Sequence, residues 1–323
     1  MSPGVKTWLP RVLAVLLLGG LLYWALRNAP LTEIWATVSR LQPWQIGALL
    51  GLNLFLYVLI TLRWWLIVRA EARQVAFWPL VAVRLAVFGI SYFTLGPQIG
   101  GEALQVLALR QKYGLSYTHA TATVLMDKLL EFLVNFLLLA VGLAAVFRAG
   151  FFPENGSQAT GSLVALGALI AWPPLHLLLL AKGRYPISFF LKKFPRTRLT
   201  RFLRAAEHLA GRFCQRRFPA LLAALGVSLL AGLGLLLDYA LMLLFVGLRL
   251  PFWQVTAGWT AGWLSFLVPL PGGLGALEAS QVFALGALGV SAATAISVTL
   301  LIRARDLLLG GVGLLIAGSV YNR

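Results

Sequence analysis

Long apolar segments separated by short polar breaks make up most of the chain. A helix needs about 20 residues to cross a bilayer. Six segments approach or exceed that length, at roughly 10–26, 44–66, 117–147, 160–181, 219–247 and 291–321. Two further apolar stretches, 77–112 and 252–288, are each interrupted by proline and glycine. The pattern predicts an all-α polytopic membrane protein with about six full spans and two interrupted hairpins.

Composition and charge agree with this class. Of the 323 residues, 60% are hydrophobic and 11% are charged, against about 25% charged residues in soluble domains. The net charge is +17, and segment 182–217 holds 11 of the 27 Lys and Arg residues. Basic loops orient membrane proteins by staying cytoplasmic, so this charge requires no nucleic acid partner. We expect a bacterial inner-membrane protein with both termini cytoplasmic.

The N-terminal apolar segment has two readings. Lys6 and Arg11 precede it, as basic residues precede the core of a signal peptide. However, Leu26-Arg27-Asn28-Ala29 is a poor small-residue cleavage site, and more apolar segments follow. An uncleaved first span is the favoured interpretation.

The basic segment 182–217 has an apolar periodicity of its own. Its apolar residues recur at helical spacing, at Leu199, Phe202, Leu203, Ala206, Leu209, Ala210 and Phe213. This predicts an amphipathic helix lying on the anionic inner leaflet. The alternative is a solvated run of charge.

The chain matches itself when shifted by 175 residues. "FWPLVA" (77–82) aligns with "FWQVTA" (252–257), and Lys128 aligns with Arg303. With a one-residue slip, Glu102-Ala-Leu-Gln105 aligns with Glu278-Ala-Ser-Gln281. Segments 44–66 and 219–247 would cross the membrane in opposite directions. The sequence therefore predicts two inverted-topology repeats, an arrangement found in many secondary transporters.

The repeat divides the chain into four predicted parts. They are a first span with an outer loop (1–43), repeat 1 (44–147), a connecting span with the basic loop (148–218), and repeat 2 (219–323).

The two interrupted stretches are predicted to be re-entrant helical hairpins. Glycine permits unusual dihedral angles and close approach, and proline ends the incoming helix. The predicted tip residues are Pro97, Gly100, Gly101, Pro271, Gly272, Gly273 and Gly275. Each outgoing helix would start at a positive dipole end that suits phosphate or carboxylate. Glu102 and Glu278 in these first turns either cap their own helices or belong to a binding site.

Charged residues also lie inside the apolar segments. A charge at mid-bilayer costs at least about 2.5–3.5 kcal/mol on insertion scales, so such residues are rarely idle. They are Asp127, Lys128, Glu131, Asp238, Arg303, Arg305 and Asp306. One reading is a set of ion pairs, Lys128–Glu131 and Arg303–Asp306, that locks the helices together. The other is a polar cavity for a charged headgroup at the repeat interface.

Signals for catalysis are weak. His119, His176 and His208 are scattered, and no phosphate-binding Gly-Lys motif or spaced set of metal ligands occurs. We expect no enzymatic activity, no metal and no cofactor.

The motifs "LGPQIGGEALQVLAL" (95–109) and "VPLPGGLGALEAS" (268–280), each followed by Gly-x-Ser and a charged pair, resemble the lysylphosphatidylglycerol synthase transmembrane family, also called flippase-like domain proteins. The resemblance covers nearly the whole chain. It implies that the cavity residues are Glu102, Asp127, Lys128, Glu131, Glu278, Arg303 and Asp306. Lys128 departs from the arginine common in the family and lacks its planar fork. A chain of 323 residues leaves no room for the soluble synthase domain, so lysine transfer is not expected.

The expected function is movement of a lipid between leaflets. Its partners would be membrane lipids with a phospholipid or polyprenyl-linked headgroup, and the anionic inner leaflet through segment 182–217. The alternative is a non-transporting scaffold for a glycosyltransferase or a lipid-modifying enzyme. The sequence specifies neither the lipid nor the oligomeric state.

Overall fold

The computed structural model describes residues 32, 35–36, 39–72, 74–94, 101–148, 157–267 and 271–321, and these residues are almost entirely helical. The helices are α3 (Pro43–Glu71), α4 (Phe77–Phe93), α5 (Glu102–Tyr113), α6 (Tyr117–Arg148), α7 (Ser157–Ala181), α8 (Pro186–Leu191), α9 (Arg198–Arg216), α10 (Phe218–Phe245), α11 (Phe252–Ser265), α12 (Ala276–Gly286) and α13 (Ala292–Tyr321), with a short 3₁₀ turn at Pro271–Gly273. The all-α prediction is confirmed. The predicted span 10–26 and the tip residues Pro97 and Gly100 lie outside the described residues.

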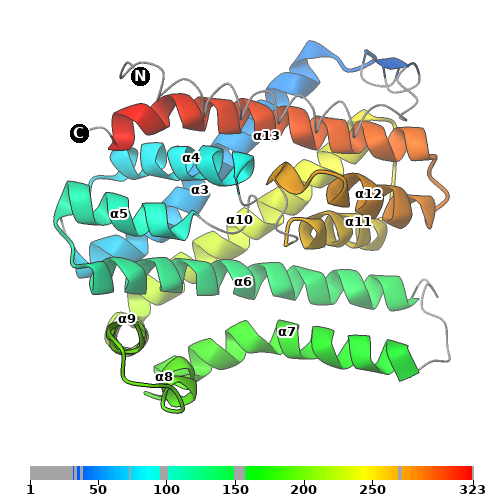
Figure 1. The fold of residues 1–323 in the computed structure, drawn as a ribbon. Helices are drawn as coiled ribbons and strands as arrows, with labels where there is room; N and C mark the ends of the chain where they lie inside the picture. Colours follow the sequence, from blue (N-terminus) through cyan, green and yellow to red (C-terminus); the bar gives the residue numbers. More distant parts are fainter. Residues whose placement is uncertain are drawn as a thin grey trace, which may run out of the picture.

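Two sets of four helices follow the same order along the chain. The N-terminal set (α3–α6) and the C-terminal set (α10–α13) each consist of a long helix, two short helices and a second long helix. Figure 1 shows the short pairs α4/α5 and α11/α12 at opposite ends of the space between α13 and α6. Each short pair occupies one of the predicted hairpin stretches.

Helices of each set pack against helices of the other set. Helix α4 packs along α13 of the other set, α11 packs along α6, and α3 packs along α10. The α4–α13 contact brings backbone against backbone: a Cβ on Gly313 would clash with the carbonyl oxygen of Leu85, and one on Gly89 with the carbonyl oxygen of Gly310. Glycine permits such close approach because it has no side chain. Each set thus depends on the other for its packing.

Local sequence explains where the short helices begin and end. Gly101 precedes α5, and Gly114 ends it with φ of 66°, in the left-handed region that glycine favours. Gly275 precedes α12 with φ of 79°, and the Glu278 carboxylate accepts a hydrogen bond from its N–H. The predicted starts near Gly101 and Gly275 are confirmed.

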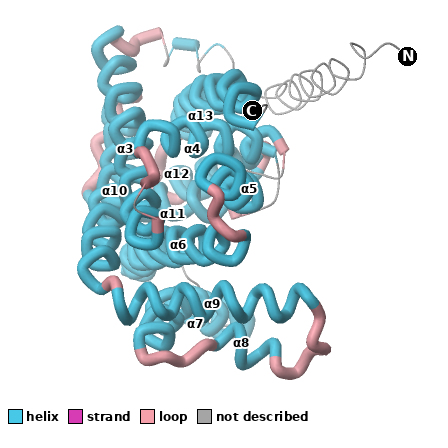
Figure 2. Tube along the Cα trace, turned by 90° about the vertical axis from the view of Figure 1, so that its left-hand side faces the viewer, coloured by secondary structure: helices cyan, strands magenta, loops and turns pink. Residues whose placement is uncertain are grey.

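Helices α7–α9 form a separate layer beneath α6. Helix α9 is seen end-on in Figure 1 and side-on in Figure 2, so it runs across the direction of α6 and α7. Thr197 caps it by accepting a hydrogen bond from the N–H of Thr200. Its apolar face packs against protein, because Ala206, Ala210 and Phe213 are buried. The predicted amphipathic helix is present, but these three residues of its apolar face pack against protein and do not face a leaflet.

The long helices are long enough to cross a bilayer, but their polarity differs. Helices α6 and α13 have 32 and 30 residues, or about 48 and 45 Å at 1.5 Å per residue. By length and apolar composition alone, two helices within the described residues, α3 and α10, could cross a membrane. Helices α6 and α13 depart from that composition through the charged residues that form the site.

Candidate functional site

A cavity of about 250 Å³ lies between the two helix sets. Its lining comes from α3–α6 on one side and from α10–α13 on the other. The lining includes the aromatic side chains of Trp259 and Trp263 on α11 and of Phe266 directly after it. It also includes most of the charged residues of the interior. The cavity can therefore receive a ligand that has both a charged and an apolar portion.

Asp127 is the centre of the ion-pair network in the N-terminal set. Its carboxylate is fully buried and accepts from Nε of Arg63 at 2.6 Å and from Nη1 of Arg84 at 2.7 Å. Glu131, one turn later on α6, lies 2.9 Å from Arg63 and 3.5 Å from Arg84. Arg63 also donates to the hydroxyl of Ser228 on α10, at 3.2 Å. This network joins α3, α4 and α6 and extends to the other set.

Lys128 occupies the edge of the same network. Its ammonium group lies 3.2 Å from Glu131 and 3.4 Å from Glu102, the first residue of α5. The predicted Lys128–Glu131 pair is confirmed. The Lys128 side chain is 18% exposed, against 4% for Arg63 and 9% for Arg84, so its ammonium group is the cation of this network most open to exchange its partners.

Arg305 is the centre of a second network, in the C-terminal set. It donates to Asp238 of α10 and, at 2.8 Å, to Asp306 beside it. The other oxygen of Asp238 accepts from the side-chain amide of Asn53 on α3, at 2.7 Å. One guanidinium therefore serves two buried carboxylates, and all four side chains line the cavity.

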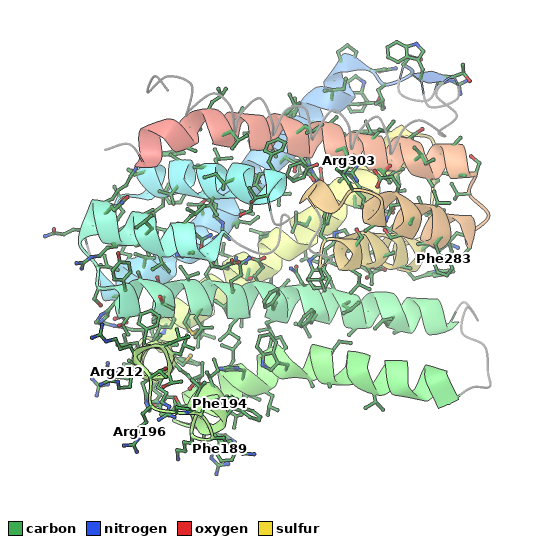
Figure 3. The ribbon with its side chains drawn as sticks, viewed as in Figure 1. Phe189, Phe194, Arg196, Arg212, Phe283 and Arg303 are labelled. Carbon is green, nitrogen blue, oxygen red and sulfur yellow. The ribbon has the colours of Figure 1, made fainter. Side chains whose placement is uncertain are left out.

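Arg303 clamps the turn before α12. It binds both carboxylate oxygens of Glu278, one at 2.8 Å, and donates to the carbonyl oxygens of Gly272 and Gly273 at 2.9 and 3.3 Å. Figure 3 shows Arg303 on the inner side of α13, facing α12. The predicted Arg303–Asp306 pair was wrong. Arg303 turns back to Glu278, and Arg305 takes Asp306 instead.

The candidate residues fall into two groups by position. Those that line the cavity are Glu102, Lys128, Glu131, Asp238 and Asp306, whereas Asp127, Glu278 and Arg303 stand outside the lining. Among the tip residues, Gly101 lines the cavity. Gly272 and Gly273 accept from Arg303, and Gly275 donates to Glu278. Pro271 begins the 3₁₀ turn that these contacts hold.

Sequence reasoning missed the part that arginine plays in both networks. Arg84 was not singled out, although it is an isolated charge in an apolar stretch, which is a readable signal. Arg63 was not among the interior charges expected from the sequence, but its side chain is 4% exposed and paired inside the protein. Arg305 was noted without a partner. Sequence separation hid the partners, since Arg63 and Asp127 lie 64 residues apart.

The same type of ion pair occurs in both helix sets. In each set the glutamate that opens the second short helix pairs with a cation on the long helix that follows, as Glu102 with Lys128 and Glu278 with Arg303. The two cations align under the 175-residue shift. The two ion pairs differ in the number of contacts. Lys128 makes one contact with each of two carboxylates, whereas Arg303 makes several hydrogen bonds with Glu278 and the preceding turn.

Comparison with known proteins gives one result for the chain as a whole. The family model described as the lysylphosphatidylglycerol synthase TM region matches residues 11–313. No curated protein and no solved structure shows a significant match.

Proposed function

Since the chain belongs to the lysylphosphatidylglycerol synthase TM-region family, it is a membrane protein, and we propose that it moves a phosphate-containing lipid, or a lipid-linked headgroup, between leaflets. The observation that carries this proposal is the charged cavity lined by both helix sets. Ionisable groups inside a membrane usually mark a pathway or a substrate site. The proposal assigns no catalytic step, metal or cofactor to the chain.

The mechanism that we propose uses the polar and apolar parts of the cavity together. The phosphate would exchange partners with Lys128, which already shares its ammonium group between two carboxylates. The aromatic wall at Trp259 and Trp263 would accommodate the apolar portion next to the headgroup. Movement of one helix set against the other would then open the cavity to either leaflet, as in transporters built from repeats.

We further propose that the two sets are inverted repeats in a bacterial inner membrane, with six spans and both termini cytoplasmic. The similar order of the two helix sets and the placing of the short pairs at opposite ends support this assignment. A cysteine at Arg196, an exposed position between α8 and α9, tests it in a Cys214→Ala background. An impermeant maleimide should label it only after the cells are lysed. Labelling in intact cells would contradict the cytoplasmic placement.

Translocation itself is tested by reconstitution. An impermeant reductant should consume nearly all of a fluorescent phospholipid in vesicles that contain the protein, but only the outer-leaflet share in protein-free vesicles. Ala231→Phe fills the cavity from α10, where Ala231 is 2% exposed, and should slow the exchange. Leu233→Phe is the matched control, because Leu233 is 56% exposed on the same helix. Exchange no faster than in protein-free vesicles, for every phospholipid tried, would refute the proposal.

A scaffold function is the second candidate, and one surface favours it. Phe189, Phe190 and Phe194 are exposed at the α8–α9 corner beside Arg196, and Figure 3 shows the labelled side chains pointing away from the helix bundle. Such a surface could hold a partner enzyme. A scaffold would tolerate Ala231→Phe and lose function on replacement of the exposed phenylalanines, the opposite of a transporter.

A further inference from the structure

At the two short-helix ends that face the cavity, a matched serine and glutamine differ in how their polar atoms are satisfied. At the α12 end, the amide of Gln281 accepts from the hydroxyl of Tyr239 at 2.6 Å and donates to the carbonyl oxygen of Gly258 at 2.9 Å. Ser265, in the last turn of α11, donates to the carbonyl three residues before it at 2.6 Å. These groups are all used inside the protein.

The corresponding groups at the α5 end are not used. Ser91 lies in the last turn of α4, as Ser265 does in α11, and Gln105 follows Glu102 as Gln281 follows Glu278. Ser91 Oγ and Gln105 Oε1 have no hydrogen-bond partner among the residues that the structure describes. Both side chains line the cavity, and the residues are only 4% and 3% exposed. Native proteins rarely leave buried polar groups unpaired, so a ligand is the natural partner.

Gly101 brings these groups to the start of α5. A Cβ at this position would clash with Val87 and lie 2.6 Å from Ser91 Oγ, so only glycine lets the N-terminus of α5 approach α4 this closely. That end of a helix carries a partial positive charge. Lys128 adds a full charge on the same side of the cavity. Its contact with Glu102 is long, at 3.4 Å, and the Glu102 side chain is 35% exposed.

We propose that Ser91, Gln105, Lys128 and the N-terminal end of α5 form the subsite for the phosphate of the headgroup, whereas the α12 end is a structural anchor. This inference rests on the proposed function and adds the location and the ligand class. The phosphate accepts from the Ser91 hydroxyl and pairs with Lys128. The Gln105 carbonyl oxygen is an acceptor and cannot bind phosphate oxygen, so it accepts from a hydroxyl next to the phosphate. The ligand class is a phosphate ester with a neighbouring hydroxyl group.

The test measures binding and stability on the same purified full-length chain. Calorimetric titrations use dioctanoyl phosphatidylglycerol, dioctanoylglycerol and inorganic phosphate as probes. The wild type should bind the first probe and not the second. Ser91→Ala and Gln105→Leu should each weaken binding about tenfold, a factor typical of one lost hydrogen bond to a charged or buried partner. If inorganic phosphate binds as tightly as the lipid, the subsite takes free phosphate, and Ser91→Ala should weaken that binding.

Stability distinguishes a ligand site from a packing defect. Without ligand, Ser91→Ala and Gln105→Leu should melt at or above the wild-type temperature, because each removes an unpaired buried polar group. Gln281→Leu and Ser265→Ala are the matched controls, and they should melt lower while binding the lipid with unchanged affinity. Unchanged affinity in both α5-end variants would overturn the inference, as would equal weakening in the α12-end controls.

The outcome also separates this inference from the proposed function. If the wild type translocates lipid and the α5-end variants bind and translocate equally well, the subsite is wrong and the transporter stands. If the wild type binds the phosphate-bearing lipid through these residues but leaflet exchange equals that of protein-free vesicles, the subsite stands and the transporter is wrong.

Discussion

Asp127→Asn removes one charge from the centre of the N-terminal network while keeping the shape of the side chain. The carboxylate of Asp127 holds Arg63 and Arg84, at 2.6 and 2.7 Å, with no exposure to solvent. The Asn side-chain amide is uncharged, so it cannot neutralise the two guanidinium groups. Removing one partner of a buried pair costs about 3–5 kcal/mol, because it leaves buried charge uncompensated. We expect the free energy of unfolding to fall by about that amount.

The expected change in melting temperature follows from this figure. A loss of 1 kcal/mol lowers the midpoint by about 2–4 °C in chains of 150–250 residues, so the variant should melt roughly 6–20 °C lower in detergent. Glu102→Gln is the control, since it makes the same carboxylate-to-amide change at a side chain that is 35% exposed. Partly exposed pairs contribute about 1 kcal/mol or less. The control should therefore melt within a few degrees of the wild type.

A double variant tests the reasoning itself. Arg63→Met combined with Asp127→Leu removes a cation and an anion together, and Arg84 keeps Glu131 at 3.5 Å. Replacing a buried pair by apolar residues is often neutral, so the double variant should recover most of the stability lost by Asp127→Asn. The network would not be structural if Asp127→Asn melted within about 2 °C of the wild type, or if the double variant were the least stable of the three.

Three further predictions concern packing, the α12 clamp and the single thiol. Gly313→Ala should lower the melting temperature, because its Cβ would meet a backbone carbonyl of α4, whereas Gly311→Ala meets nothing within 4 Å and should be neutral or gain up to about 1 kcal/mol. Arg303→Lys keeps the charge but removes the guanidinium fork. Each charge-assisted hydrogen bond that lysine cannot replace should lower the free energy of unfolding by about 1.5–3 kcal/mol, measured by thermal unfolding. Lys128→Arg, the control, should melt near the wild-type temperature. Burial raises the pKa of the Cys214 thiol to about 11; since only the thiolate reacts, labelling of native protein should be slow at pH 8, accelerate as the pH rises, and become rapid on unfolding in SDS.

The helices were predictable from the sequence because their limits are set by local signals. The apolar segment 219–247 became α10 at Phe218–Phe245, with Pro219 in its first turn. The hairpin stretch 77–112 became α4 and α5, and α5 begins directly after Gly101, as predicted. Helix α8 was missed because it has six residues, too few for a periodicity to show. The lengths of the apolar segments and the positions of glycine and proline therefore predict most of the helices.

The pairing of charges could not be predicted in the same way. Sequence spacing reveals neighbours within one helix, so it suggested Arg303–Asp306 and correctly gave Lys128–Glu131. It cannot reveal a partner on another helix, such as Glu278 for Arg303, 25 residues away. The apolar face of α9 was misread for a related reason. A face that is apolar at helical spacing meets either lipid or protein, and only the tertiary packing against α6 and α7 decides between them.

The distribution of charge between the two sets bears on where an anion can enter. The interior groups of the N-terminal set are three cations and three carboxylates: Arg63, Arg84, Lys128, Glu102, Asp127 and Glu131. Those of the C-terminal set are two cations and three carboxylates: Arg303, Arg305, Asp238, Glu278 and Asp306. A phosphate near Arg305 would add to an existing excess of negative charge, which is costly in a low-dielectric interior. Near Lys128 it meets a set of three cations and three carboxylates with no excess of negative charge. Electrostatics and the unpaired Ser91 and Gln105 therefore select the same end of the cavity on independent grounds.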